Sequence, residues 1–156
     1  MTSLSKKLAV FVCSGFGSGY SPKAPGTAGS AAALIFWYGL KSQVPHLEWF
    51  ADAAIAVVIT LTGLIAVATV VGRGSSDDPQ WIVIDEWAGL FLALVGINIH
   101  QVGAFIVAFV SFRIFDATKL GPVGRAEGLP GAWGIMADDI VAGAMAACVV
   151  QLYLLV

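Results

Sequence analysis

The run from Ala53 to Val71 limits what this chain can fold into more than any other feature, because it contains no charged residue. Its length matches the ~20 apolar residues that an α-helix needs to cross a bilayer. The rest of the chain agrees: 58% of the 156 residues are hydrophobic, 12% are charged, and the mean hydropathy is +0.87. Soluble domains are about 45–50% apolar and about 25% charged. The sequence therefore predicts an all-α integral membrane protein.

Two further uncharged runs, from Ala24 to Leu40 and from Ile140 to Val156, are slightly short but adequate for membrane helices. The stretch from Leu8 to Val12 is shorter than the apolar core of a signal peptide, so we expect it to be retained as a short N-terminal helix. A chain of this length is within the size of one domain. We therefore expect a single membrane-embedded domain, 1–156, with about four main hydrophobic helices.

The stretch from Trp87 to Phe112 could form one long helix, but turn-prone and polar residues interrupt it at 96–101. We therefore predict a helical hairpin over 83–118, with arms at about 83–97 and 101–118. Both arms are short for full spans at ~1.5 Å per residue. Their small Ala and Gly faces could pack against a second copy of the chain, which leaves a homo-oligomer open.

Basic residues in the loops indicate the orientation, because cytoplasmic loops are enriched in lysine and arginine. With the hairpin in place, the other side of the membrane carries only Lys41. This arrangement predicts that the N-terminus and the loops at 73–86 and 113–139 face the cytoplasm. The residues on that side are Lys6, Lys7, Lys23, Arg73, Arg113, Lys119 and Arg125.

Several classes of function are excluded by charge and by cysteine spacing. The net charge is −2, which gives no clustered basic face for nucleic acid. Cys13 and Cys148 are far apart and lack the paired spacing of a zinc or redox motif, so they are expected to be apolar helix residues. Neither precedes an arginine-containing phosphate loop. His46 and His100 fall in the predicted outer loops, and we assign them no role.

A glycine-rich segment at 15–30 precedes the first long hydrophobic helix and contains two prolines and several hydroxyls. Such a loop can bring backbone N–H groups up to a phosphate. A plain connection between helices explains the composition equally well, and the segment fits neither common nucleotide-binding pattern. The candidate phosphate-binding residues in it are Ser18, Lys23, Thr27 and Ser30.

Paired acids occur where hydrophobic segments begin. Asp85 and Glu86 lie between apolar residues, where an unpaired carboxylate is costly and favours a cation, whereas Asp77 and Asp78 suit helix capping. Asp138-Asp139 is a second pair, at a point where we expect a loop to enter an apolar helix.

Arg113, Asp116 and Lys119 are spaced at i, i+3 and i+6, which places them on one side of a helix. They could simply pair with one another. Alternatively, Asp116 holds a metal while Arg113 and Lys119 bind phosphate oxygens. The acids form an oxygen-rich set without His or Cys, which suits Mg²⁺. The candidate metal-binding and catalytic residues are Asp85, Glu86, Asp116, Asp138 and Asp139.

Four segments together resemble the bacterial phosphatidylglycerophosphatase A family: GFGSGYSPKAPGTAGS at 15–30, IDEWAG at 84–89, RIFDATK at 113–119 and GIMADDIVAG at 134–143. They occur in the family's order with similar gaps. The resemblance implies Mg²⁺-dependent hydrolysis of phosphatidylglycerophosphate to phosphatidylglycerol and inorganic phosphate at the inner membrane.

The chain departs from the family pattern after Lys119. The family usually continues with Pro-x-Pro, whereas this chain has Leu120-Gly121-Pro122. Glu127, in the glycine-rich loop at 120–133, stands where the family commonly has an acid, and its role stays open.

The expected mechanism is metal-assisted hydrolysis by water, with an aspartyl-phosphate intermediate as the alternative. A phosphatase of another lipid phosphate would share the metal site and differ in its headgroup contacts. A cation channel or transporter would spread its acids through the bilayer depth, whereas these acids gather at helix ends on one predicted side. A structural partner subunit would lose no chemistry when the acids are replaced.

Overall fold

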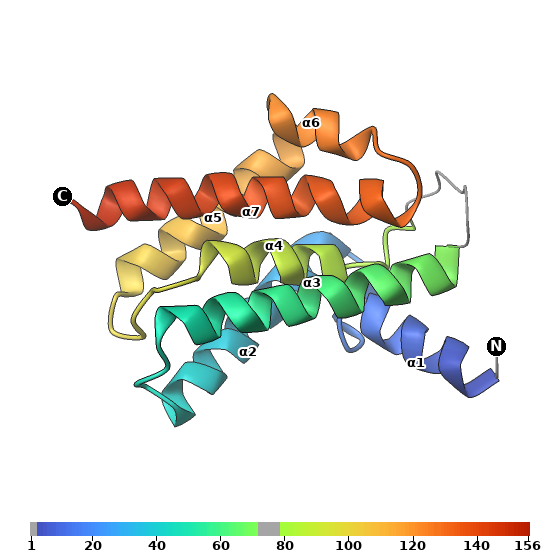
Figure 1. The fold of residues 1–156 in the computed structure, drawn as a ribbon, viewed down its shortest axis with the longest axis horizontal. Helices are drawn as coiled ribbons and strands as arrows, with labels where there is room; N and C mark the ends of the chain where they lie inside the picture. The colour runs from blue at the N-terminus through green and yellow to red at the C-terminus, as the bar shows by residue number, and fades with distance from the viewer. Residues whose placement is uncertain (1–2, 72–78) are drawn as a thin grey trace.

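A computed structural model describes residues 3–71 and 79–156, and every regular element in these ranges is helical. The predicted all-α class is therefore confirmed, and so is the hairpin, because two of the helices are joined by a short turn at 94–101 (Figure 1). The elements are α1 (Ser3–Cys13), the 3-10 helix η1 (Ser18–Tyr20), α2 (Pro25–Gln43), α3 (Trp49–Val71), α4 (Ile84–Ala93), α5 (Val102–Thr118), α6 (Pro122–Glu127) and α7 (Ala132–Leu154).

Two helices in the described ranges, α3 and α7, are long and apolar enough to cross a membrane, with 23 residues each. The hairpin arm α4 has only 10 residues, or about 15 Å at 1.5 Å per residue, so the predicted arm at 83–97 is too long. It ends early because Gly96, with φ 78°, belongs to a turn. Arg73, Asp77 and Asp78 lie outside the described residues.

α7 begins at Ala132, eight residues before the predicted start at Ile140. The sequence interpretation placed Asp138 and Asp139 at the mouth of this helix, and that placement is wrong. Both acids lie in its second turn, because the preceding Gly131 (φ 62°) turns the chain and the apolar residues after it already belong to the helix. The loop at 120–133 also contains α6, which buries Val123.

The short helix α4 lies between α3 and α7 (Figure 1), and most of its side chains are buried. Close approach to α7 depends on two glycines. A Cβ on Gly89 would collide with the backbone of Asp139, and a Cβ on Gly143 would collide with the backbone of Gly89. Small residues at such crossings let membrane helices pack backbone to backbone. The crossing brings the start of α4 beside the acids of α7.

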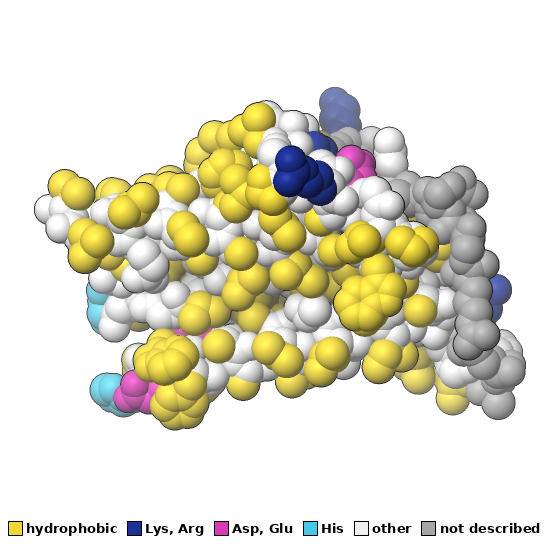
Figure 2. Space-filling model, turned by 45° about the horizontal axis from the view of Figure 1, so that its top comes forward, with side chains coloured by type: hydrophobic (Ala, Val, Ile, Leu, Met, Phe, Trp, Pro, Cys, Tyr) yellow, Lys and Arg dark blue, Asp and Glu magenta, His cyan; other side chains and the backbone are white. Residues whose placement is uncertain are grey.

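Large hydrophobic side chains remain exposed along the outer faces of the helices, as Figure 2 shows for one face of the molecule. α5 carries a continuous stripe of them with a spacing of four residues: Val102, Ile106, Val110 and Ile114. α3 exposes Val57, Val58, Leu61 and Ile65. Exposed apolar area on this scale indicates contact with lipid or with another protein. It agrees with the predicted membrane location.

Lys41 is not the exposed loop charge that the sequence suggested. Its ammonium group is buried at the end of α2, 2.8 Å from a carboxylate oxygen of Asp52 in α3. Because this charge is neutralised inside the protein, Lys41 is not counted among the loop charges that predict the orientation in the membrane.

Candidate active site

One cavity of about 440 Å³ collects most of the charged residues that the sequence singled out. It lies among the start of α2, the start of α4, the end of α5 and the second turn of α7. The lining residues are Ala24, Pro25, Gly26, Gln80, Ile82, Asp85, Glu86, Arg113, Asp116, Lys119, Asp138 and Asp139. Segments more than 100 residues apart in the sequence therefore contribute to one site.

Three carboxylates converge in this cavity. Asp85, Glu86 and Asp139 each offer one oxygen, and the three oxygens lie within 4.8 Å of one another. Within the described part of the chain, Glu86 Oε2 and Asp139 Oδ1 are buried without a hydrogen-bond partner. Buried carboxylate oxygens without a donor are costly unless a cation compensates them. Hard oxygen donors at this spacing fit a divalent ion such as Mg²⁺.

Asp116, which also lines the cavity, lies between two basic side chains. It accepts a hydrogen bond of 2.6 Å from Arg113 Nη1 and one of 2.9 Å from Lys119 Nζ. Lys119 Nζ also donates to Asp138 Oδ2 at 2.6 Å. The mutual pairing that the i, i+3 spacing allowed is therefore present. The pairing also extends to α7, which the spacing alone did not predict.

Lys119 reaches both acids because of its backbone conformation. It follows the last residue of α5 with φ 49°, a left-handed geometry that ends the helix and turns the side chain back toward the cavity. Burial lowers the pKa of Lys119, but hydrogen bonds to Asp138 and Asp116 outweigh this effect and raise it above its ordinary value. The ammonium group therefore stays charged.

The glycine-rich segment meets the cavity at the start of α2. A Cβ on Gly26 would collide with Glu86 Oε1, so only glycine fits there without displacing that carboxylate. Ser30, one turn later, donates a 2.8 Å hydrogen bond to the Gly26 carbonyl and accepts one of 3.4 Å from Arg113 Nη1. Arg113 Nη1 also lies 3.8 Å from Glu86 Oε1. The arginine thus links α2, α4 and α5.

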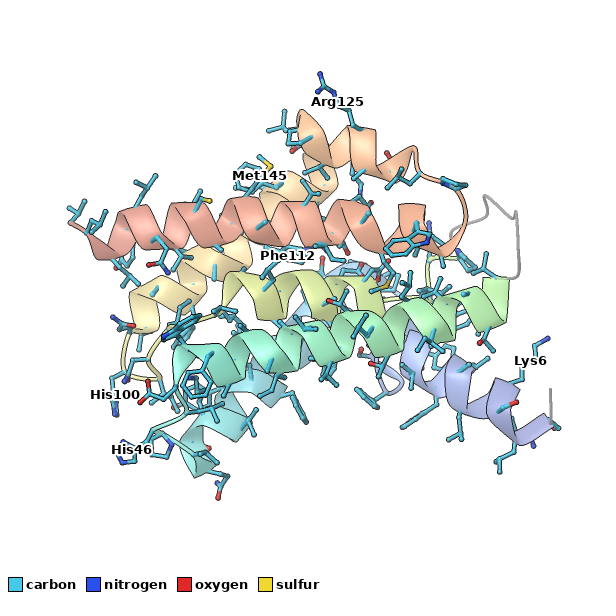
Figure 3. The ribbon with its side chains drawn as sticks, viewed as in Figure 1. Lys6, His46, His100, Phe112, Arg125 and Met145 are labelled. Atoms are coloured by element: carbon cyan, nitrogen blue, oxygen red, sulfur yellow. The ribbon has the colours of Figure 1, made fainter. Side chains whose placement is uncertain are left out.

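Other predicted phosphate-binding residues do not line the cavity. The Ser18 hydroxyl donates to the Gly15 carbonyl at 2.8 Å, within its own turn, and Lys23 and Thr27 are exposed. Glu127 is also exposed and outside the cavity lining. The two histidines lie at the opposite end of the molecule, as Figure 3 shows.

Sequence reasoning missed Gln80 and Ile82, which line the cavity just before α4. Gln80 is an uncharged polar residue among acids and bases, and nothing in its local pattern distinguishes it. Gly26 was recognised only as part of the glycine-rich segment at 15–30. The signal that could have found it is its place immediately after Pro25, at the start of a helix, where a missing side chain leaves room for another helix.

The sequence profile of the phosphatidylglycerophosphatase A family matches residues 11–154, which is nearly the whole chain. The chain belongs to the phosphatidylglycerophosphatase A family. The expected resemblance is therefore confirmed, and the four segments that suggested it fall within the matched range. As a member of this family, the chain is a lipid phosphatase.

Three curated relatives are similar over most of their length. A protein of Bacteroides thetaiotaomicron named "Putative phosphatidylinositol-3-phosphatase" is 39% identical over 87% of this chain and 87% of its own. The phosphatidylglycerophosphatase A of Escherichia coli K12 is 34% identical over 85% of this chain and 76% of its own. The phosphatidylglycerophosphatase A of Haemophilus influenzae is 34% identical over 87% of this chain and 82% of its own. No solved structure matches the chain significantly.

Proposed function

We propose that this phosphatase hydrolyses phosphatidylglycerophosphate to phosphatidylglycerol and inorganic phosphate in a Mg²⁺-dependent reaction. One observation carries the proposal: three converging carboxylates lie in the same cavity as two basic side chains, as phosphate transfer with a metal requires. The family profile and two of the three relatives carry the name of this activity, which favours this substrate among lipid phosphates.

Asp85, Glu86 and Asp139 would hold the metal ion, because their carboxylates converge, and Glu86 and Asp139 each have one buried oxygen without a hydrogen-bond partner among the described residues. When bound, Mg²⁺ would polarise the phosphate and lower the pKa of a coordinated water. Asp116 and Asp138, which the sequence also proposed as ligands, already bind Lys119 and are close enough to complete the acidic set.

Arg113 and Lys119 would bind the phosphate oxygens in place of part of their present carboxylate contacts. Both side chains are only partly buried, at 22% and 31% exposure, so a ligand entering the cavity can reach them. Asp116 holds both cations at the cavity wall before substrate arrives, so little reorganisation is needed. Ser30 supports Arg113 from α2.

In the hydrolytic step, a water oxygen forms a bond to phosphorus and the bond from phosphorus to the headgroup oxygen breaks. The leaving oxygen takes a proton and becomes the glycerol hydroxyl of the product. Water is our preferred nucleophile, and attack by one of the carboxylates is the alternative, which would leave a phosphorylated enzyme. Trapping with acid and labelled substrate distinguishes the two, because only the alternative leaves label on the protein.

The proposed location is the bacterial inner membrane, with the cavity facing the cytoplasm. Two helices that could span a bilayer support the membrane location. The exposed basic residues Lys6, Lys7, Lys23 and Arg125 support the orientation, because cytoplasmic segments are enriched in them. Labelling of cysteines introduced near α6 in intact cells and in inverted vesicles tests the orientation.

The substrate is tested by phosphate release from purified protein in detergent micelles, with Mg²⁺ or EDTA, on a panel of lipid phosphates. We expect metal-dependent release that is fastest with phosphatidylglycerophosphate. Faster release from phosphatidylinositol 3-phosphate would favour the activity named in the Bacteroides relative and would overturn the substrate assignment. Glu48→Gln, which is far from the cavity, is a matched control for Glu86→Gln.

A further inference from the structure

The N-terminal helix α1 has a buried face, an exposed apolar face and two lysines. Ala9 and Cys13 are buried against the helix bundle. The opposite side exposes Leu4, Leu8 and Phe11, which are 66%, 57% and 52% exposed and share one side because they are spaced at i, i+4 and i+7. Within the described part of the chain, each of these three residues keeps more than half of its surface exposed.

Lys6 and Lys7 are the charged side chains of α1. Both are exposed, and in Figure 3 Lys6 points away from the other helices. Lys7 precedes Phe11 by four residues and therefore lies at the edge of the Leu4, Leu8 and Phe11 stripe, whereas Lys6 lies about 100° further around the helix. A helix with an exposed apolar face that is bordered by lysine is suited to the boundary between lipid headgroups and acyl chains. Its 11 residues are too few to cross a bilayer.

The apolar stripe also connects to the proposed active site. Phe11 packs edge to face on Phe16, with ring centroids 5.4 Å apart, and Phe16 packs in the same way on Trp87 at 5.2 Å. Trp87 directly follows Glu86. In addition, the carbonyl of Cys13 accepts a 2.8 Å hydrogen bond from the backbone of Val83, just before α4. The position of α1 is thus tied to the start of the helix that bears Asp85 and Glu86.

We propose that α1 is an in-plane docking surface for an anionic bilayer. Leu4, Leu8 and Phe11 insert between the acyl chains, and Lys6 and Lys7 bind negatively charged headgroups. Charge complementarity argues for an anionic membrane rather than a second copy of the chain, because two α1 helices meeting side by side would bring four lysines together. The inference concerns docking and does not depend on which lipid phosphate is hydrolysed.

The depth of each face can be measured on the whole protein in vesicles of phosphatidylcholine and phosphatidylserine. Spin labels are attached at Phe11→Cys or Lys6→Cys in a Cys148→Ser background; Cys148 is exposed, whereas Cys13 is buried. We expect the label at 11 to collide mainly with oxygen and the label at 6 mainly with a water-soluble nickel chelate. The proposal would be overturned if both labels were exposed to water or if both were exposed to lipid. It would also be overturned if both labels were shielded from the two reagents, because that result would indicate contact between copies of the chain.

The requirement for anionic lipid is tested with Lys6→Gln/Lys7→Gln, and Lys6→Arg/Lys7→Arg is the matched control. With the parent lysines, adding phosphatidylserine to phosphatidylcholine vesicles should move the label at 11 deeper. Each lysine near an anionic surface contributes about fivefold to membrane partitioning, so removing both should abolish most of this shift. The arginine variant should retain it. An equal shift in the glutamine variant would overturn the role of the lysines, and phosphatase activity enters neither measurement.

Discussion

The Lys41–Asp52 pair and the acidic cavity are two buried charged regions at opposite ends of this protein. They differ in whether all of their polar side-chain atoms have hydrogen-bond partners. At the far end, Lys41 donates to Asp52 at 2.8 Å and to the Leu47 carbonyl at 3.0 Å, while the same Asp52 oxygen accepts from the backbone of Gly96 at 3.2 Å. One cation meets one carboxylate, and both are almost fully buried. This arrangement joins three chain segments, and the two charges neutralise each other.

The candidate active-site cavity is assembled differently. Five carboxylates face two basic side chains, and two carboxylate oxygens have no hydrogen-bond partner in the described ranges. Negative charge exceeds positive charge in a partly buried space, which is unfavourable for a structural site. The comparison teaches that burial alone does not mark function in a membrane protein; an excess of unsatisfied ligands of one charge does.

The largest expected effect is a loss of activity when an acid of the cavity is replaced. Asp139→Asn keeps the shape of the side chain but removes one of the three converging charges. We expect kcat/KM to fall by about 10³-fold or more, because the site loses both metal affinity and stabilisation of the transition state. Phosphate release measured over a range of Mg²⁺ concentrations checks this. Activity within a few-fold of the parent protein would remove Asp139 from the metal site.

The far-end pair should show the opposite behaviour. Lys41→Met leaves Asp52 buried without its cation, which should lower the free energy of unfolding by about 3 kcal/mol. Thermal unfolding in detergent measures the loss. Lys41→Met/Asp52→Leu should recover most of it, because no isolated charge remains. Activity per folded molecule should be unchanged in both, and a large loss of kcat would show that this pair is not purely structural.

Gly26→Ala tests how tightly α2 fits against the acids. The new Cβ would displace Glu86, and misplacement of a catalytic group by about 1 Å can cost about 100-fold in rate. We therefore expect kcat to fall by about that factor with little change in thermal stability. Gly39→Ala on the same helix is the control, because nothing lies within 4 Å of its Cβ. Similar activities for the two variants would contradict the fit.

The smallest expected effect is stabilisation by the metal itself. Mg²⁺ at tens of times its dissociation constant should stabilise the folded protein by about 2 kcal/mol. This corresponds to an increase in Tm of about 4–8 °C for a chain of this size. The increase should disappear in Asp139→Asn and persist in Lys41→Met. An equal increase in both variants would mean that the ion binds elsewhere.

Much of the fold was predictable from the sequence because its strongest signals are local. The uncharged run at 53–71 predicted most of α3, and the polar interruption at 96–101 predicted the turn between α4 and α5. The boundaries were less predictable. The start of α7 at Ala132 and the end of α4 at Ala93 both depend on turns that contain glycine, Gly131 and Gly96.

For the site, the sequence by itself determined which kinds of side chain are available: acids for a metal, and an arginine and a lysine for phosphate. Their spacing also predicted the Arg113–Asp116–Lys119 pairing, since residues three apart meet on a helix. Only the tertiary structure decided which acids converge. Asp85 and Glu86 meet Asp139 because Gly89 and Gly143 let α4 and α7 approach backbone to backbone, a contact between segments 50 residues apart that no local pattern encodes. It also decided that Lys41 is neutralised by Asp52, since burial of a charge depends on what the whole fold places around it.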